Sequence, residues 1–185
     1  MFDTIAVNFT SRTVNIGMDE AHMLGRGRYM DIKGIKNSFG ILLDHLRKVA
    51  EIAEKRVFEL IMWGDMFFRL LNVSKGGSYY DEVTVPDEIK EMIPKNVNLI
   101  YWDYYSEDID MYRYQIKAHS EIKSSIWFAG GLWSWTGFTP HNQYSINATA
   151  MAFSACFEGG MQDVILTLWG DDGGECSKFA LLPSL

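Results

Sequence analysis

Short apolar runs alternate with longer stretches of helical period along most of this 185-residue chain. Five such runs are rich in β-branched and aromatic residues, and each has the near-continuous apolar pattern of a parallel strand that is covered on both faces. The runs span residues 12–17, 57–63, 97–102, 125–130 and 163–169. Because strands that alternate with helices define an α/β fold, the chain is predicted to form a parallel sheet with helical connections.

The stretches between the runs carry apolar residues at helical spacing. They predict helices over residues 38–56, 87–92, 111–123 and 144–158, and over residues 1–9 the end of a helix that begins upstream. Asn37 or Ser38 is suited to cap the first of these, because its side chain can accept from backbone N–H groups. His45 and His119 lie within predicted helices and are expected at their surfaces.

Tryptophan residues stand at the ends of four of the five runs. The segments concerned are Trp63-Gly64-Asp65, Trp102-Asp103-Tyr104, Leu132-Trp133-Ser134-Trp135 and Trp169-Gly170-Asp171.

Two parallel folds compete, an open doubly wound sheet and a (β/α)8 barrel. No glycine-rich phosphate loop follows any run, which disfavours a nucleotide-binding sheet. Since barrel enzymes build their active sites at the carboxyl ends of their strands, the sequence favours a parallel barrel of the TIM type.

Five strands are too few to close an eight-stranded barrel, which usually needs about 250 residues. We therefore expect residues 1–185 to be a single unit, the C-terminal part of a (β/α)8 catalytic domain that holds its fourth to eighth strands. An unclosed parallel sheet leaves two edges and much apolar surface uncovered. Self-association through these exposed barrel edges is expected in consequence.

Flat aromatic side chains beside carboxylates suit a sugar ring. The C–H face of a pyranose stacks on an indole ring, while its hydroxyl groups donate to carboxylate oxygens. Phe, Trp and Tyr make up 14% of the chain, and three of the four Trp-bearing strand ends carry an Asp within two residues. The sequence therefore predicts a carbohydrate pocket at this edge of the sheet.

Asp19 and Glu20 are adjacent carboxylates that end the first run, in Ile16-Gly17-Met18-Asp19-Glu20-Ala21. Neighbouring strand residues point to opposite faces, so both side chains can reach one pocket only if the chain turns there. In one pocket each carboxylate raises the cost of ionising the other, and one is expected to be protonated near neutral pH. A protonated acid beside an ionised one serves glycosidic-bond hydrolysis. An exposed acidic turn is the alternative interpretation.

Composition excludes several classes of partner. The net charge of −7 argues against nucleic acid, because phosphate binding needs clustered Lys and Arg. No apolar run approaches the roughly 20 residues that span a bilayer, so no membrane partner is expected. The first residues lack the basic head and long apolar core of a signal peptide, which slightly favours a cytoplasmic location.

No metal or other cofactor is expected. Cys156 and Cys176 are too few for a zinc site or a disulfide framework and are interpreted as buried thiols. Asp172 and Glu175 lack the alternating oxygen ligands of a calcium loop. A metal-dependent barrel hydrolase is a further possible function. The scarcity of histidine at the strand ends opposes it, because such metal sites depend on imidazole ligands.

The segment from Ile16 to Ala21 closely resembles the catalytic signature of family-20 glycoside hydrolases, the β-N-acetylhexosaminidases. In that family an Asp-Glu pair ends the fourth barrel strand, and Trp residues from later strands wall the terminal sugar. Trp169-Gly170-Asp171 is similar to the family's Trp-Gly-Glu on the eighth strand, with Asp in place of Glu. Trp63-Gly64-Asp65 resembles its fifth-strand end. The resemblance extends over nearly the whole chain in order.

The resemblance implies an exo-acting enzyme that removes terminal GlcNAc or GalNAc from glycans. Glu20 would protonate the glycosidic oxygen and later activate water, and Asp19 would orient the 2-acetamido group and stabilise its positive charge. The acetamido oxygen attacks the anomeric carbon, so the mechanism is substrate-assisted and retaining. The implied substrate-binding residues are Trp63, Asp65, Trp102, Tyr104, Trp133, Trp135, Trp169 and Asp171.

This chain departs from the family's pattern at the seventh strand, where a Tyr in a Trp-Tyr-x-Asp context usually binds the acetamido carbonyl. Here the stretch reads Leu132-Trp133-Ser134-Trp135, and Tyr104 is the substitute candidate. The family's early-strand sugar ligands lie outside the chain, so weak binding and poor hydrolysis are expected of it alone. The alternative function is a non-catalytic carbohydrate-binding α/β module. The sequence leaves the choice between GlcNAc and GalNAc open.

Overall fold

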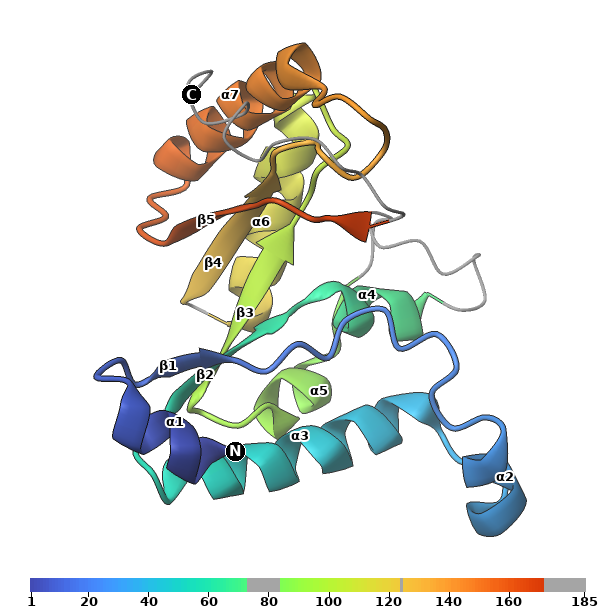
Figure 1. Cartoon of the computed structure of the whole chain (residues 1–185). Helices are drawn as coiled ribbons and strands as arrows, with labels where there is room; N and C mark the ends of the chain where they lie inside the picture. Colours follow the sequence, from blue (N-terminus) through green and yellow to red (C-terminus); the bar gives the residue numbers. More distant parts are fainter. Residues whose placement is uncertain (73–83, 124, 172–185) are drawn as a thin grey trace. The chain divides into compact units, whose positions relative to one another are not determined.

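The computed structural model describes residues 1–72, 84–123 and 125–171, and the chain divides into two compact units, Met1–Leu99 and Ile100–Leu185 (Figure 1). The elements of the first unit are α1 (Phe2–Asn8), β1 (Thr13–Asn15), α2 (Arg28–Lys33), α3 (Ser38–Glu54), β2 (Glu59–Trp63), α4 (Asp65–Leu71) and α5 (Asp87–Met92). β3 (Val97–Trp102) begins in the first unit and ends in the second. The second unit continues with α6 (Ile109–Ile122), β4 (Ile126–Gly131), α7 (Asn142–Glu158) and β5 (Val164–Thr167).

The predicted α/β class and all five predicted strands are confirmed. The strands form one parallel sheet in the order β1-β2-β3-β4-β5. Val14 of β1 lies opposite Leu60 of β2, and Ala129 of β4 lies opposite Ile165 of β5. A doubly wound sheet reverses its strand order at a switch point, and this order has no reversal. A sequential parallel order is the one that a β/α barrel uses.

The strands differ in burial. β2, β3 and β4 are buried along most of their length, whereas β1 and β5, which end the strand order, are exposed or half-buried. The two outer strands therefore have the incomplete covering expected of sheet edges. That residues 1–185 belong to one catalytic barrel domain stays a prediction.

Helix α3 follows the predicted amphipathic pattern. The side chain of Asn37 accepts from the Gly40 N–H at 2.9 Å, which confirms Asn37 as the cap. The helix packs on β2 and α4 through the apolar residues predicted from the periodicity. The buried members are Phe39, Leu42, Leu43, Leu46, Ala50 and Ala53. Burial of each large side chain contributes about 1.5–3 kcal/mol, so this face holds the first unit together.

A β-branched residue occupies the left-handed position after α3. Phe58 N–H donates to Ala53 O at 3.1 Å and Val57 N–H donates to Glu54 O at 2.9 Å, which is the hydrogen-bond pair of a Schellman motif. Val57 has φ 57° and is 79% exposed. A Cβ in this region collides with the backbone, and glycine is the residue that normally avoids the collision.

Val57→Gly should therefore stabilise the protein. Relief of the left-handed strain outweighs the extra backbone entropy of glycine, and the expected gain is about 1 kcal/mol, or a rise in Tm of about 3 °C. Thermal unfolding followed by circular dichroism measures it. Lys55→Gly is the matched control, because Lys55 has φ −60° at the end of the same helix. That variant should lose about 1 kcal/mol. Equal effects of the two glycines would contradict the account.

Two helices were not predicted. α4 begins two residues after β2 ends, with Met66, Phe67 and Phe68 buried. Apolar residues stand on both sides of Gly64-Asp65, so the change from strand period to helical period is hard to see in the sequence. α2 lies in a glycine-rich segment between Gly27 and Gly34, both with positive φ, and none of its residues is buried.

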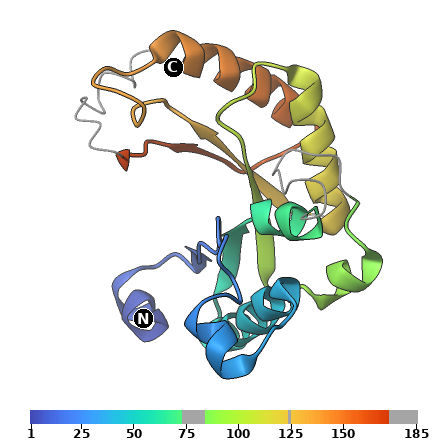
Figure 2. The same ribbon diagram turned by 90° about the vertical axis from the view of Figure 1, so that its right-hand side faces the viewer.

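In the second unit, α6 and α7 lie side by side (Figure 2). The rings of Tyr101, Tyr112 and Phe128 meet in the core with centroid distances of 5.5 to 6.4 Å. α7 presents small residues to its neighbours, which permits close approach of the two helices. Its buried residues are Ser145, Ala148, Thr149, Ala152, Ala155 and Cys156. The prediction that Cys156 is a buried thiol is confirmed, and burial raises its pKa to about 12. Cys176 lies outside the described residues.

The prediction of a surface position is confirmed for His45 and wrong for His119. His119 is only 3% exposed, and its ring lies 4.9 Å from that of Tyr101. The reason is the helical period, because His119 falls on the same buried stripe of α6 as Tyr112, Ile116 and Ile122. Desolvation lowers the pKa of His119 to about 4.

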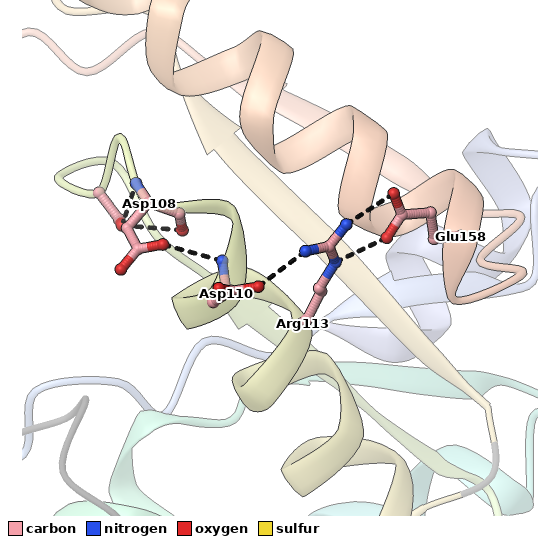
Figure 3. A network of polar contacts seen from close by, with 5 residues as sticks. Asp108, Asp110, Arg113 and Glu158 are labelled. Carbon is pink, nitrogen blue, oxygen red and sulfur yellow. Dashed lines mark hydrogen bonds and ion pairs between the residues drawn. The ribbon is translucent and has the colours of Figure 1, made fainter.

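A surface ion-pair network joins α6 to α7 (Figure 3). Arg113 donates to both carboxylate oxygens of Glu158, at 2.7 and 2.9 Å, and to Asp110 at 2.7 Å. Asp108 caps α6 by accepting from the Asp110 N–H at 2.9 Å. The hydrogen bonds from Arg113 hold the pKa of Glu158 below its usual range. All three paired side chains are 46% exposed or more, so the network fixes helix geometry more than it adds stability.

Candidate functional site

The Asp19-Glu20 pair lies in a turn that leaves the carboxyl end of β1. Ile16 N–H donates to Ile61 O at 2.9 Å, and Trp63 N–H donates to Gly17 O at 3.2 Å. These bonds extend the pairing with β2 past the end of β1. The predicted turn at the end of the first run is therefore present, and it begins at Gly17.

The backbone of this turn is strained. Gly17, Met18 and Glu20 have φ angles of 69°, 72° and 45°. For Met18 and Glu20 the left-handed region costs about 1–2 kcal/mol each. Such strain persists only where surrounding contacts impose it, and it gathers at functional sites. The turn also removes the difficulty that adjacent strand residues point to opposite faces.

Asp65 holds the strained turn in place. Its carboxylate accepts from the Glu20 N–H at 3.0 Å, and Asp65 is only 5% exposed at the start of α4. The structure shows that Asp65 positions the backbone of Glu20, and its predicted role in sugar binding stays a prediction. The side chains of Asp19 and Glu20 themselves are exposed. Trp63, which ends β2, is 8% exposed and belongs to the core of the first unit.

The loop beyond the pair is anchored to the start of α3. Ser38 Oγ donates to Leu24 O at 3.0 Å, and His22 N–H donates to Glu20 O at 2.7 Å. Gly25 has φ 78°, and a Cβ there would lie 2.8 Å from Cδ1 of Ile41. The positive φ favours glycine at this position, and a larger residue would also have to displace the end of the Ile41 side chain.

Six aromatic residues of the second unit form one cluster, here called the aromatic cluster. Its members are Trp102, Tyr104, Tyr105, Trp133, Trp135 and Tyr144. Trp133 is central, with ring centroids 5.0 Å from Trp135, 5.2 Å from Tyr105 and 4.8 Å from Tyr144. The structure thus brings together four predicted site residues, Trp102, Tyr104, Trp133 and Trp135.

Members of the aromatic cluster differ in exposure. Tyr104 and Trp135 are buried, Trp102 and Trp133 are half-buried, and Tyr105 is 51% exposed. The buried rings of Tyr104 and Trp135 therefore pack against the more exposed rings of Trp102 and Trp133. Tyr105 and Tyr144 were missed by the sequence reasoning. Tyr105 directly follows a predicted site residue, but Tyr144 lies at the start of a helix and carried no signal.

Trp169 and Asp171 follow β5. Ser134 Oγ donates to Trp169 O at 2.8 Å, which ties the segment to the loop after β4. Trp169 is 38% exposed and Asp171 is exposed. Asp172 and Glu175, which were considered for a calcium loop, lie outside the described residues.

Gly131 lets two rings of the aromatic cluster approach the end of β4. A Cβ at this position would lie 2.7 Å from Cδ1 of Tyr104 and 2.8 Å from Cη2 of Trp135. Real Cβ atoms do not approach other atoms so closely, so a larger residue at position 131 must displace a ring. The ring that moves is one that supports Trp133 or Trp102.

Gly131→Ala should lower the free energy of unfolding by about 1–2 kcal/mol, because it overpacks a filled space. It should also change the near-UV circular dichroism spectrum, which reports the packing of the Trp and Tyr rings. Urea unfolding followed by Trp fluorescence measures the loss. Gly137→Ala is the matched control, since a Cβ at Gly137 meets nothing within 4 Å. A neutral Gly131→Ala would show that the rings have room to move.

Within the described residues, no group of three or more His, Cys, Asp or Glu side chains is placed to hold a metal ion. The described helices include none that is long and apolar enough to cross a membrane. No family model matches this chain, and no curated protein matches it either. The assignment of a function therefore depends on the residues of the chain itself.

Proposed function

We propose that this chain is the C-terminal part of the (β/α)8 catalytic domain of an exo-acting β-N-acetylhexosaminidase. Such an enzyme hydrolyses terminal β-linked GlcNAc or GalNAc with retention of configuration. One observation carries the proposal. Asp19 and Glu20 sit on a strained turn at the carboxyl end of β1, and a buried carboxylate, Asp65, holds the backbone of Glu20 there. Strain held by a buried polar contact is characteristic of a catalytic loop.

In the first step, Glu20 gives its proton to the glycosidic oxygen as the bond from this oxygen to the anomeric carbon breaks. The acetamido oxygen of the substrate attacks the anomeric carbon and forms a cyclic oxazolinium ion. The carboxylate of Asp19 orients the acetamido group and stabilises the positive charge that develops on its nitrogen. A positioned intramolecular nucleophile replaces an enzyme nucleophile, which accounts for two adjacent carboxylates with different tasks.

In the second step, Glu20 takes a proton from water, and the water oxygen attacks the anomeric carbon. The ring of the oxazolinium ion opens and the acetamido group is restored. Two displacements at one carbon give net retention. Trp102 and Trp133, which are half-buried, are the proposed stacking residues for the C–H face of the sugar, and the exposed Asp171 is the proposed acceptor for a sugar hydroxyl.

A second candidate function is a carbohydrate-binding module without catalysis. The observation that favours it is the exposure of both Asp19 and Glu20, since an acid catalyst usually needs a less polar surrounding. Under the first proposal, that surrounding comes from the bound sugar and from the strands that complete the barrel.

The partly covered strands β1 and β5 support self-association of the chain when it is alone.

The test is release of 4-nitrophenol from its β-GlcNAc and β-GalNAc glycosides. The 185-residue chain is compared with the protein extended upstream in its reading frame, and size-exclusion chromatography reports the association state of each. Activity that is strong in the extended protein and weak in the chain alone supports the proposal. A well-folded extended protein that binds GlcNAc but hydrolyses neither glycoside would leave the binding module as the better account.

A further inference from the structure

Asp103 is a buried carboxylate that is not among the substrate-binding residues that the resemblance implies. It directly follows β3, is 3% exposed, and lies between Trp102 and Tyr104 of the aromatic cluster. Three donors converge on it. Tyr101 Oη donates to Oδ2 at 3.0 Å, and the N–H groups of Tyr105 and Ser106 donate to Oδ1 at 2.8 and 3.2 Å. Desolvation raises the pKa of Asp103, and the three donors oppose that rise.

The same loop is held from its other side by aromatic side chains. Trp133 Nε1 donates to Tyr104 O at 2.6 Å, and Tyr112 Oη donates to Ser106 O at 2.7 Å. Tyr144 Oη donates to Tyr105 O. The backbone carbonyl groups of Tyr104, Tyr105 and Ser106 thus each accept a hydrogen bond from an aromatic side chain. These side chains come from the segment after β4, from α7 and from α6, respectively. The position of the loop therefore fixes the position of the rings.

We propose that Asp103 is a positioning residue for sugar binding, which fixes the loop of residues 103–106 and through it the stacking faces of Trp133 and Tyr105. The inference rests on the proposed function, because it specifies how the proposed sugar platform is held. Asp103 is buried and acts through the loop. It is expected to influence how tightly the hexosamine ring binds more than the rate of bond cleavage.

A carboxylate suits this position because it accepts hydrogen bonds and need donate none. In Asp103→Asn the amide oxygen can still accept from the two N–H groups, and the amide nitrogen can donate to Tyr101 Oη. That variant should retain the loop. Asp103→Leu has the same branching but leaves the part-buried N–H groups of Tyr105 and Ser106 without this acceptor, which is unfavourable. The loop should then shift and release the Trp133 indole N–H.

The experiment uses the extended protein and two readouts. In the first, Asp103→Leu should raise KM for 4-nitrophenyl β-GlcNAc about tenfold with kcat changed less than about threefold, and Asp103→Asn should restore KM to nearly the wild-type value. In the second, the indole N–H of Trp133 should exchange slowly with solvent in the wild type and in Asp103→Asn, as seen by NMR. It should exchange rapidly in Asp103→Leu.

Ile116→Ala is the control for general destabilisation, since Ile116 is buried on α6. It should leave both readouts unchanged. If Asp103→Leu does not fold, Tyr101→Phe removes one donor to the carboxylate and should shift both readouts in the same direction by a smaller amount. A KM and an indole exchange rate that stay at wild-type values in Asp103→Leu or Tyr101→Phe would overturn the inference. Rapid exchange in Asp103→Leu without hydrolysis by the wild type would overturn the proposed function alone.

Discussion

Glu20→Gln should lower kcat for β-N-acetylglucosaminides by about 10²–10⁴-fold, the usual contribution of a general acid–base group. The amide keeps the shape of the side chain and removes the proton that the leaving oxygen needs. The Glu20 N–H remains available to Asp65, so the turn should keep its conformation. Sugar binding should change by less than about threefold, because the stacking residues are untouched.

The leaving group makes this test specific. 4-Nitrophenolate is a stable anion that needs little protonation, whereas an alkoxide leaving group needs much. The loss of rate in Glu20→Gln should therefore be greater for a GlcNAc disaccharide than for the 4-nitrophenyl glycoside. Glu54→Gln, an exposed glutamate at the end of α3, is the matched control and should have normal turnover. Equal losses on both substrates would argue that Glu20 is not the proton donor.

Acidification should destabilise the protein through His119. Its pKa is 6.5 in an unfolded chain and about 4 in the folded one, because burial disfavours the charged ring. Between these values the unfolded state binds a proton that the folded state does not, so stability falls as pH falls from about 6.5 to about 4. Each unit corresponds to about 1.4 kcal/mol, which gives a loss of up to about 3 kcal/mol.

His119→Phe isolates this contribution. A phenyl ring keeps a flat face against Tyr101, whose ring lies 4.9 Å from that of His119, and cannot be protonated. Denaturant unfolding of both proteins at pH 7.5, 6, 5 and 4 measures the difference. The free energy of unfolding of the wild type should fall relative to that of His119→Phe by up to about 3 kcal/mol between pH 7.5 and pH 4. Other titrating groups, including Asp103, are common to both proteins and largely cancel. Parallel pH profiles would contradict the burial of a neutral His119.

The periodic elements could be predicted from the sequence because their signals are local. All five strands and the helices α1, α3, α5, α6 and α7 lie where the sequence indicated. α4 was missed because it is short and begins two residues after β2 ends, so its few apolar residues carry little helical periodicity. His119 was misplaced because a histidine was taken as polar, although it falls on the buried stripe of α6. Val57 shows the limit of residue preferences, since an exposed β-branched residue occupies a left-handed position where glycine is favoured.

The candidate site was predicted less completely than the fold. The Asp19-Glu20 turn and the meeting of Trp102, Tyr104, Trp133 and Trp135 follow from the rule that parallel strand ends share one edge. Hydrogen bonds between residues far apart in the chain depend on three-dimensional distances, which the spacing of residues in the sequence does not give. Asp65 accepts from the Glu20 N–H, which the sequence did not indicate, and its contact with sugar stays a prediction. Asp103 could not be distinguished from its neighbours until the three donors around it were visible.

The central claim is substrate-assisted hydrolysis by Glu20, in which the nucleophile belongs to the substrate. The most direct measurement compares kcat/KM of the extended protein on 4-nitrophenyl β-GlcNAc and on 4-nitrophenyl β-glucoside, which differs only in carrying a 2-hydroxyl in place of the acetamido group. The account predicts a ratio of at least about 10³, since an oriented intramolecular nucleophile is lost with that group. Similar hydrolysis of both glycosides would contradict it, because the chain would then have to supply a nucleophile of its own.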